Sequence, residues 1–337
     1  MNLAGLSRGS LSVLAAFGIL AGCGGAQSAM NRVVPSDSVT AQSQVHRASS
    51  SGTPLVYTFG SFHNAKGLIL SYPAGTVVNN LTAPFSPDGI CSDADGNVFI
   101  GGQDASTVRP VMAEYAYGAT SASSPISIGN TNGSVRGCSI DQTTGNVAAL
   151  IQYDSFNFAV AVLPHFTGTP QIYQDTSIYR FLSVGYDGSG NLYLLGASPG
   201  SSAYYLAELP SGGSSLQPIS LNLGSNATEL RTLQWDGSRI TLEGGYNPGF
   251  GKPKTWTQAV YQLTISGSSA SVAATIKLRA HNKDFQTSWI APSVNALVLT
   301  QGKIRFFKYP AGGKETKRIK TGQGPANMGT VALPTSR

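Results

Sequence analysis

Five polar or charged residues each stand directly before a short run of residues that is typical of a β-strand. They are Asp88, Arg136, Arg231, Gln286 and Asn327. A carboxylate can hold a hard cation, whereas arginines repel a cation and suit an anionic or carbohydrate ligand. We therefore expect a binding site for such a ligand if the fold brings the five places together.

Two cysteines, Cys91 and Cys138, lie in the runs that follow Asp88 and Arg136. Counted from the glycine that opens each run, their positions differ by one residue, and in a strand this offset points the two side chains to opposite faces. Opposite faces of neighbouring sheets meet, so a disulfide between the two cysteines is one expectation. The alternative is that both are small buried hydrophobic residues.

The runs belong to a repeat, and residues 87–102 (PDGICSDADGNVFIGG) are its clearest copy. The copy predicts a short strand, an Asp-Gly-Asn turn and a β-branched return strand. The turn recurs at Asn97, Asn146, Asn191, Arg239 and Asn295. These positions are 45 to 56 residues apart. An aromatic strand and a more polar strand follow each hairpin, so each repeat has four predicted strands, and such a period is typical of a β-propeller.

The two ends of the repeat region are incomplete copies that complement each other. Residues 55–72 lack the first strand of a repeat, and residues 329–333 supply a first strand alone. Pairing them leaves no open sheet edge. We therefore expect an all-β, six-bladed propeller of four-stranded blades, closed by the N- and C-terminal strands. Seven blades are the alternative, because the interval of 56 residues could hold an insertion such as 244–256, and a pair of β-sandwiches is a further one.

The composition agrees with many short strands and tight turns. Charged residues make up 11% of the chain, and 40 of its 337 residues are glycine. The net charge of +6 is far from the dense basic face that a nucleic-acid-binding protein needs. We expect a monomer that does not bind nucleic acid.

The N-terminus predicts an export signal that stays outside the fold. Arg8 precedes an apolar stretch, 11–20, that is too short to span a bilayer as a helix. The stretch ends in Leu20, Ala21, Gly22 and Cys23, and this sequence resembles the bacterial lipobox. The resemblance implies a signal peptide over 1–22 and a lipidated Cys23. The alternative is an ordinary secretory peptide with a chance cysteine.

Gly24 follows the lipobox cysteine, so the aspartate that signals inner-membrane retention in that family is absent. We expect the protein in a bacterial cell envelope on its lipid anchor. In a Gram-negative host the anchor would lie in the outer membrane, and the protein would face the periplasm or the cell surface. Residues 23–52 are rich in Ser, Gln and Ala and predict a flexible tether of roughly 30 Å. The propeller domain is expected over 53–337.

The strand, turn and Tyr-Pro-x-Gly-Gly pattern of 53–337 resembles NHL-repeat propellers and their gluconolactonase-like and streptogramin-lyase-like relatives. The gluconolactonase-like relatives hold a divalent metal with Glu, Asn and Asp, which implies Asp88, Glu229 and Asn327 as weak metal candidates here. A matching Glu and a second Asn are missing at the equivalent strand starts. The lyase-like relatives use histidine, but His63, His165 and His281 share no register.

Two further sets of charged residues have structural and functional interpretations. The hairpin aspartates are expected to bond their own turns rather than form a site. They are Asp93, Asp95, Asp141, Asp187 and Asp236. A basic patch is predicted in the last repeat at Lys314, Lys317, Arg318 and Lys320. It is either a solvated face that protects a sheet edge or a surface for anionic envelope polymer or lipid headgroups.

Two function classes follow. The first is a lipid-anchored extracytoplasmic binding or interaction module with an envelope polymer or protein as partner and with no cofactor. The alternative is a propeller hydrolase or lyase of the lactonase type, which would need a divalent cation. A metal titration distinguishes them, because a ligand that binds only the native state raises its stability.

Overall fold

The structure is a computed structural model. It describes residues 53–332 apart from 61–64, 156, 176–177, 179, 199–202, 225–226, 247–256, 280–286, 292–295, 301–302 and 321–327. All of them belong to one compact unit, Arg47–Arg337. The predicted signal peptide 1–22, Cys23 and the predicted tether 23–52 lie outside the described residues.

Strands form nearly all of the regular structure in these ranges, so the predicted all-β fold is confirmed. The exception in the described part is a single 3-10 turn, η1 (Pro164–Phe166). No helix within the described ranges is long and apolar enough to cross a membrane.

Four of the described sheets have four strands each, and neighbouring strands in them are antiparallel. The first consists of β25 (Met328–Ala332), β1 (Leu55–Phe59), β2 (Lys66–Ser71) and β3 (Val77–Thr82). The second consists of β4 (Ser86–Ser92), β5 (Val98–Gln103), β6 (Pro110–Tyr115) and β7 (Ile126–Ser127). The third consists of β8 (Ser134–Ile140), β9 (Val147–Gln152), β10 (Phe158–Leu163) and β11 (Gln171–Tyr173). The fourth consists of β20 (Thr287–Ala291), β21 (Ala296–Thr300), β22 (Lys303–Lys308) and β24 (Lys317–Lys320).

The fifth described sheet has nine strands, because two groups of four join at their edges and one short strand is added to them. One group is β12 (Arg180–Tyr186), β13 (Leu192–Ala197), β14 (Tyr204–Leu209) and β15 (Gln217–Asn222). The other is β16 (Ala227–Trp235), β17 (Ile240–Tyr246), β18 (Thr257–Ser266) and β19 (Ser269–Arg279). The edge strands β15 and β19 pair in parallel, with Ser220 opposite Ser269, and the short β23 (Gly313–Lys314) pairs with the far end of β19. β18 and β19 are 10 and 11 residues long. This long hairpin accounts for part of the 56-residue interval between Arg239 and Asn295, the interval that suggests a seventh blade as the alternative.

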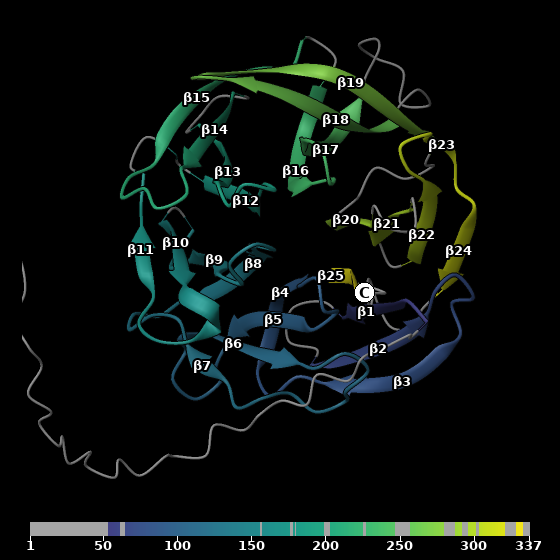
Figure 1. Cartoon of the computed structure of the whole chain (residues 1–337). Helices are drawn as coiled ribbons and strands as arrows, with labels where there is room; N and C mark the ends of the chain where they lie inside the picture. Colours follow the sequence, from purple (N-terminus) through teal and green to yellow (C-terminus); the bar gives the residue numbers. More distant parts are fainter. Residues whose placement is uncertain are drawn as a thin grey trace, which may run out of the picture. The chain divides into compact units, whose positions relative to one another are not determined.

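The two ends of the described chain meet in one sheet. β25 pairs with β1 along its whole length, from Leu55 opposite Ala332 to Phe59 opposite Met328. The first strand of this sheet therefore comes from the C-terminal end of the sequence, and the other strands come from the N-terminal end of the repeat region. Figure 1 shows β25 and β1 side by side.

The first strands of successive groups contact one another in a closed cycle. β25 contacts β4, and the contacts continue through β8, β12, β16 and β20 back to β25. These strands lie innermost in Figure 1, and the later strands of each group lie farther out. In the described part, six hydrophobic clusters follow the same cycle, each between two neighbouring groups. Both faces of a strand are therefore buried, as in β1, where Val56 and Tyr57 belong to different clusters.

The prediction is confirmed for four of the hairpin aspartates, Asp93, Asp141, Asp187 and Asp236, which cap their own turns. Asp93 accepts a hydrogen bond from the backbone N–H of Asn97 at 2.8 Å. Asp236 accepts one from the backbone N–H of Arg239 at 2.7 Å. Asp141 and Asp187 make bonds of the same kind. A carboxylate that satisfies turn N–H groups fixes the reversal between the first and second strands, which explains its recurrence.

Candidate functional site

Three of the predicted site residues lie where the register between a first strand and its second strand is irregular. The strand register shifts around Asp88 in β4, around Arg136 in β8 and next to Arg231 in β16. A bulge turns one side chain out of the regular alternation. Here the three side chains line one cavity of about 160 Å³ between the first strands. Gln286 and Asn327, the other two predicted residues, lie outside the described residues.

The fourth bulge of this kind carries Leu182 in β12, and this residue also lines the cavity. Trp289 of β20 lines it as well. The indole of Trp289 also packs on the hydrophobic cluster that contains Cys91 and Cys138, which belong to β4 and β8. Trp289 therefore reaches across the centre of the cycle and gives the cavity an aromatic wall.

Asp88 and Arg136, which both line the cavity, form an ion pair. Oδ2 of Asp88 also accepts a hydrogen bond from Oγ of Ser134 at 3.1 Å. Nε of Arg136 donates to Oε1 of Gln152 at 2.6 Å. The Asp88 side chain is 13% exposed, so the pair is partly shielded from water. These contacts hold Arg136 in one orientation and neutralise much of the charge of Asp88.

Arg231 is held more loosely. Its Nη2 atom lies 3.7 Å from Oε2 of Glu229, and the two side chains are 44% and 51% exposed. An ion pair of this length and exposure contributes little stability. Among the described residues, the guanidinium group has no closer ionic contact than this one, and Arg231 lines the cavity.

The weak metal candidates do not converge in the described structure. Asp88 faces Arg136, Glu229 faces Arg231, and Asn327 lies outside the described residues. The described residues contain no group of three or more His, Cys, Asp or Glu side chains that could hold a metal ion. A cation at Asp88 would have to compete with the guanidinium group of Arg136.

A buried carboxyl group lies behind the cavity wall. Glu243 of β17 is opposite Thr232 in β16 and is 5% exposed. Burial raises its pKa to about 7, although hydrogen bonds from Ser288 and Thr232 and the charge of Arg231 lower it. Its Oε1 atom has no hydrogen-bond partner among the described residues. Thr232 and Ser288 both line the cavity, so Glu243 is one layer away from it.

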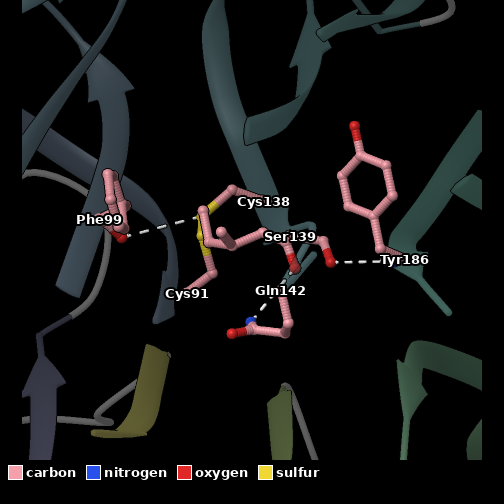
Figure 2. The surroundings of a disulfide bond; sticks show 7 residues. Cys91, Phe99, Cys138, Ser139, Gln142 and Tyr186 are labelled. Carbon is pink, nitrogen blue, oxygen red and sulfur yellow. Dashed lines mark hydrogen bonds between the residues drawn. A yellow bond between two sulfur atoms is a disulfide. The ribbon is translucent and has the colours of Figure 1, made fainter. Parts of the chain in front are cut away.

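The sulfur atoms of Cys91 and Cys138 are 2.01 Å apart and form a disulfide between β4 and β8 (Figure 2). The two backbones also approach each other closely two residues before Cys91, at Gly89. A Cβ atom added to Gly89 would lie 2.6 Å from the backbone nitrogen of Gly137. Cys138 also lines the cavity, so the disulfide is part of its wall.

Hydrogen bonds, rather than a disulfide, join β8 to β12 and β12 to β16 at related positions. Ser139 Oγ, at the position in β8 that corresponds to Cys91 in β4, accepts a bond from the backbone N–H of Tyr186 in β12 at 3.0 Å. Between β12 and β16, Ser183 Oγ accepts from Leu233 N–H at 2.9 Å. The side chains of Cys138, Ser139 and Ser183 therefore contribute to closing the cycle as well as lining the cavity.

Gln234 makes the corresponding connection between β16 and β20. Its amide nitrogen donates to the carbonyl of Ile290 at 2.7 Å, and its amide oxygen accepts from the Ile290 N–H at 2.9 Å. Both ends of the amide group are therefore occupied by the neighbouring strand. Gln234 lines the cavity but is held in place by the fold.

The predicted basic patch lies mainly on the outermost strand of the fourth sheet. Lys314, Lys317 and Arg318 are exposed, and the side chain of Lys320 lies outside the described residues. Arg318 forms an ion pair with Glu315. The Lys317 ammonium group donates to the carbonyl of Ala74 in the turn that leads to β3.

Sequence reasoning found the three charged cavity residues and missed others. It did not select Leu182 or Trp289, which are apolar and resemble ordinary core residues. It also missed Glu243, although a signal was present. At the equivalent place the second strands β5, β9 and β13 carry Gly101, Leu150 and Leu195, so a carboxylate there departs from the repeat.

Comparison with known proteins gives the fold and no family. No protein-family model matches the sequence, and no curated protein matches it. The chain is similar in structure to hydrazine synthase from Kuenenia stuttgartiensis, with a TM-score of 0.54 and 12% identity over 81% of this chain and 84% of that one. It is also similar to a protein of unknown function from Bacteroides caccae, with a TM-score of 0.56 and 11% identity over 83% of this chain and 99% of that one.

TolB from Acinetobacter baumannii is a third similar structure, with a TM-score of 0.57 and 10% identity over 83% of this chain. The match covers 66% of TolB, which is just under two thirds of its length. These neighbours have propeller folds. At such low identity a likeness carries over the fold alone, and the fold of this chain is therefore of the β-propeller type.

Proposed function

We infer that the protein is a six-bladed propeller that acts as a binding module and recognises its ligand in the cavity at the centre of the cycle. The observation that carries the proposal is the convergence of Asp88, Arg136 and Arg231 on one cavity of about 160 Å³. Concave sites with a few convergent polar groups are the usual places for ligands. The closed cycle of first strands supports six blades, with the joined edges of β15 and β19 as a contact between two blades.

The cavity can be blocked without touching its charged residues. Leu182→Trp adds bulk at the bulge of β12 that lines the cavity. Ile172→Trp is the matched control, because Ile172 lies in β11 with 46% of its surface exposed. Native mass spectrometry of protein incubated with a periplasmic small-molecule extract should reveal a bound species that Leu182→Trp loses and Ile172→Trp keeps. Retention of the same species by Leu182→Trp would contradict the proposal.

The lactonase-type alternative makes a different prediction for the wild-type protein. A calcium- or zinc-dependent rise in Tm together with lactone turnover would replace the binding module by a metal-dependent enzyme. The ion pair between Asp88 and Arg136 favours the binding module, because the positively charged guanidinium group of Arg136 already occupies the carboxylate that would bind the metal.

The proposal places the propeller in the cell envelope on a lipid anchor at Cys23, and the NHL-like repeat pattern belongs to the same proposal. The support is the lipobox-like sequence 20–23 directly after an apolar stretch. Labelled palmitate should enter the wild-type protein in a Gram-negative host and should not enter Cys23→Ser. Equal labelling of the two proteins would show that Cys23 is not the lipidated residue and would contradict the proposed anchor.

The basic patch is proposed as a second contact surface, for anionic lipid headgroups. Lys314, Lys317 and Arg318 are exposed, and β3 beside them carries Val77 and Val78, which are 53% and 56% exposed. The Lys317 bond to the turn before β3 keeps the basic and aliphatic parts together. Basic and apolar side chains on one surface suit the interface of an anionic membrane.

A further inference from the structure

We propose that the central cavity binds a small organic anion, with its carboxylate on Arg231 and its apolar body against Trp289 and Leu182. This inference rests on the proposed function, because it assigns a ligand class to the same cavity. It follows from three properties of the cavity: which of its polar groups are already occupied, which charge remains available, and how large the space is.

Most polar groups of the wall are occupied by the fold. Both ends of the Gln234 amide bond the backbone of β20, and Ser183 Oγ bonds the backbone of β16. Thr232 and Ser288 bond the buried carboxyl group of Glu243. A neutral polyol needs several available donors and acceptors, because a buried polar group left without a partner is costly. The occupied wall therefore disfavours a carbohydrate.

The guanidinium groups of Arg136 and Arg231 differ in how far other residues already bond them. Arg136 bonds Asp88 and Gln152, so binding a ligand there would break existing contacts. Arg231 forms one ion pair in the described part of the chain, with Glu229, at a separation longer than a hydrogen bond. The planar guanidinium group of Arg231 can bind a carboxylate with two parallel hydrogen bonds. Arg231 is therefore the group that selects an anion.

The remaining wall is apolar and the space is small. Leu182 stands where three other first strands carry a charged residue, and Trp289 supplies an aromatic wall. The cavity volume is about 160 Å³. A protein cavity of about 150 Å³ is large enough to hold benzene. The ligand body is therefore the size of one six-membered ring or a short branched chain, and a polymer could enter only by its end group.

Isothermal titration of the full chain with five probes tests the inference. Benzoate carries both the charge and the ring, benzamide has the ring without the charge, acetate has the charge without the ring, and glucose is a neutral polyol. We expect benzoate to bind at least about tenfold more tightly than each of the others. Benzamide and glucose lack the hydrogen bonds of a charged carboxylate, which are worth about a factor of ten or more. Acetate lacks the ring, whose burial removes apolar surface from water. Inorganic phosphate is the fifth probe and distinguishes a simple anion site, since it lacks an apolar body.

Arg231→Gln should weaken benzoate binding about tenfold or more and leave benzamide binding unchanged. Arg109→Gln is the matched control, because it removes an equal charge at an exposed residue that does not line the cavity. Urea unfolding of both variants checks that they remain folded, so that weaker binding is not a consequence of unfolding. A loss in Arg231→Gln with no loss in Arg109→Gln supports the inference.

Other results overturn it in distinguishable ways. If glucose or benzamide binds as tightly as benzoate and Leu182→Trp abolishes that binding, the ligand class is wrong and the cavity remains the binding site. If phosphate binds as well as benzoate, the apolar wall plays no part and the inference is wrong in that respect. If benzoate does not bind the wild-type protein, or binds Leu182→Trp equally well, no small organic anion occupies this cavity.

Discussion

The buried carboxyl group of Glu243 should make the stability of the protein depend on pH. Its pKa is raised from 4.5 to about 7, chiefly by burial. Between these two values the native state holds a proton that the unfolded chain has released. Raising the pH through this window therefore favours unfolding.

The size of the effect follows from the shift. One pKa unit corresponds to about 1.4 kcal/mol, so the shift of Glu243 from 4.5 to about 7 amounts to about 3 kcal/mol. This stability should be fully present below about pH 4.5 and lost above about pH 7. Glu243→Gln replaces the carboxyl group with a neutral group of the same shape. The variant should be more stable than wild type at about pH 8, by up to about 3 kcal/mol, and close to it at about pH 5.

Urea unfolding of both proteins at several pH values between about pH 5 and about pH 8 measures this difference. Glu243→Met, which has neither the charge nor the hydrogen bonds, should also lose the pH dependence. It should be less stable than Glu243→Gln at every pH. The reasoning is refuted if the free energy of unfolding of wild type and Glu243→Gln changes in parallel with pH. It is also refuted if Glu243→Gln is the less stable protein at the alkaline end.

Three other changes test the cycle of first strands and its outer surface. Gly89→Ala should lower the free energy of unfolding by about 1–3 kcal/mol, because its Cβ atom would meet the backbone of β8 at 2.6 Å. Gly137→Ala should be close to neutral, because no neighbouring atom lies within 4 Å of the added Cβ atom. Equal losses of stability to urea in the two variants would argue against the close approach. Replacing both Cys91 and Cys138 by Ala should lower the free energy of unfolding by about 4 kcal/mol, since the bridge spans 47 residues; a variant that unfolds at the same urea concentration as oxidised wild type would contradict this. Changing Lys314, Lys317, Arg318 and Lys320 to Gln should weaken binding to anionic liposomes at least about tenfold, with neutral liposomes as control, and unchanged binding would mean that the patch is only a solvated face.

The architecture was predictable because its signals are local and repeated. The Asp-Gly-Asn turn near Asn97 returns at regular intervals, and the four copies among the described residues are fixed by bonds within a few residues. The pairing of the chain ends was also within reach, since an incomplete N-terminal copy and a lone C-terminal strand complete one sheet. The parallel contact between β15 and β19 was not predictable, because it depends on how far the long β18–β19 hairpin extends toward its neighbour.

The site was predictable only in part. Asp88, Arg136 and Arg231 could be aligned because each precedes the same strand, and the bulges then turn all three toward one cavity. Leu182 has the same place, but its side chain gives no chemical signal. The role of Trp289 depends on its reach across the cycle to residues far away in the sequence, and strand periodicity carries no information about such a distance.

The proposed function depends on ligand recognition in the cavity between the first strands. A crystal structure of the protein soaked with benzoate would show whether the ligand binds there. We expect one benzoate in the cavity, with its carboxylate on the guanidinium group of Arg231 and its ring against Trp289. Benzoate bound elsewhere with an empty cavity, or bound in the cavity with its carboxylate turned away from Arg231, would contradict this expectation.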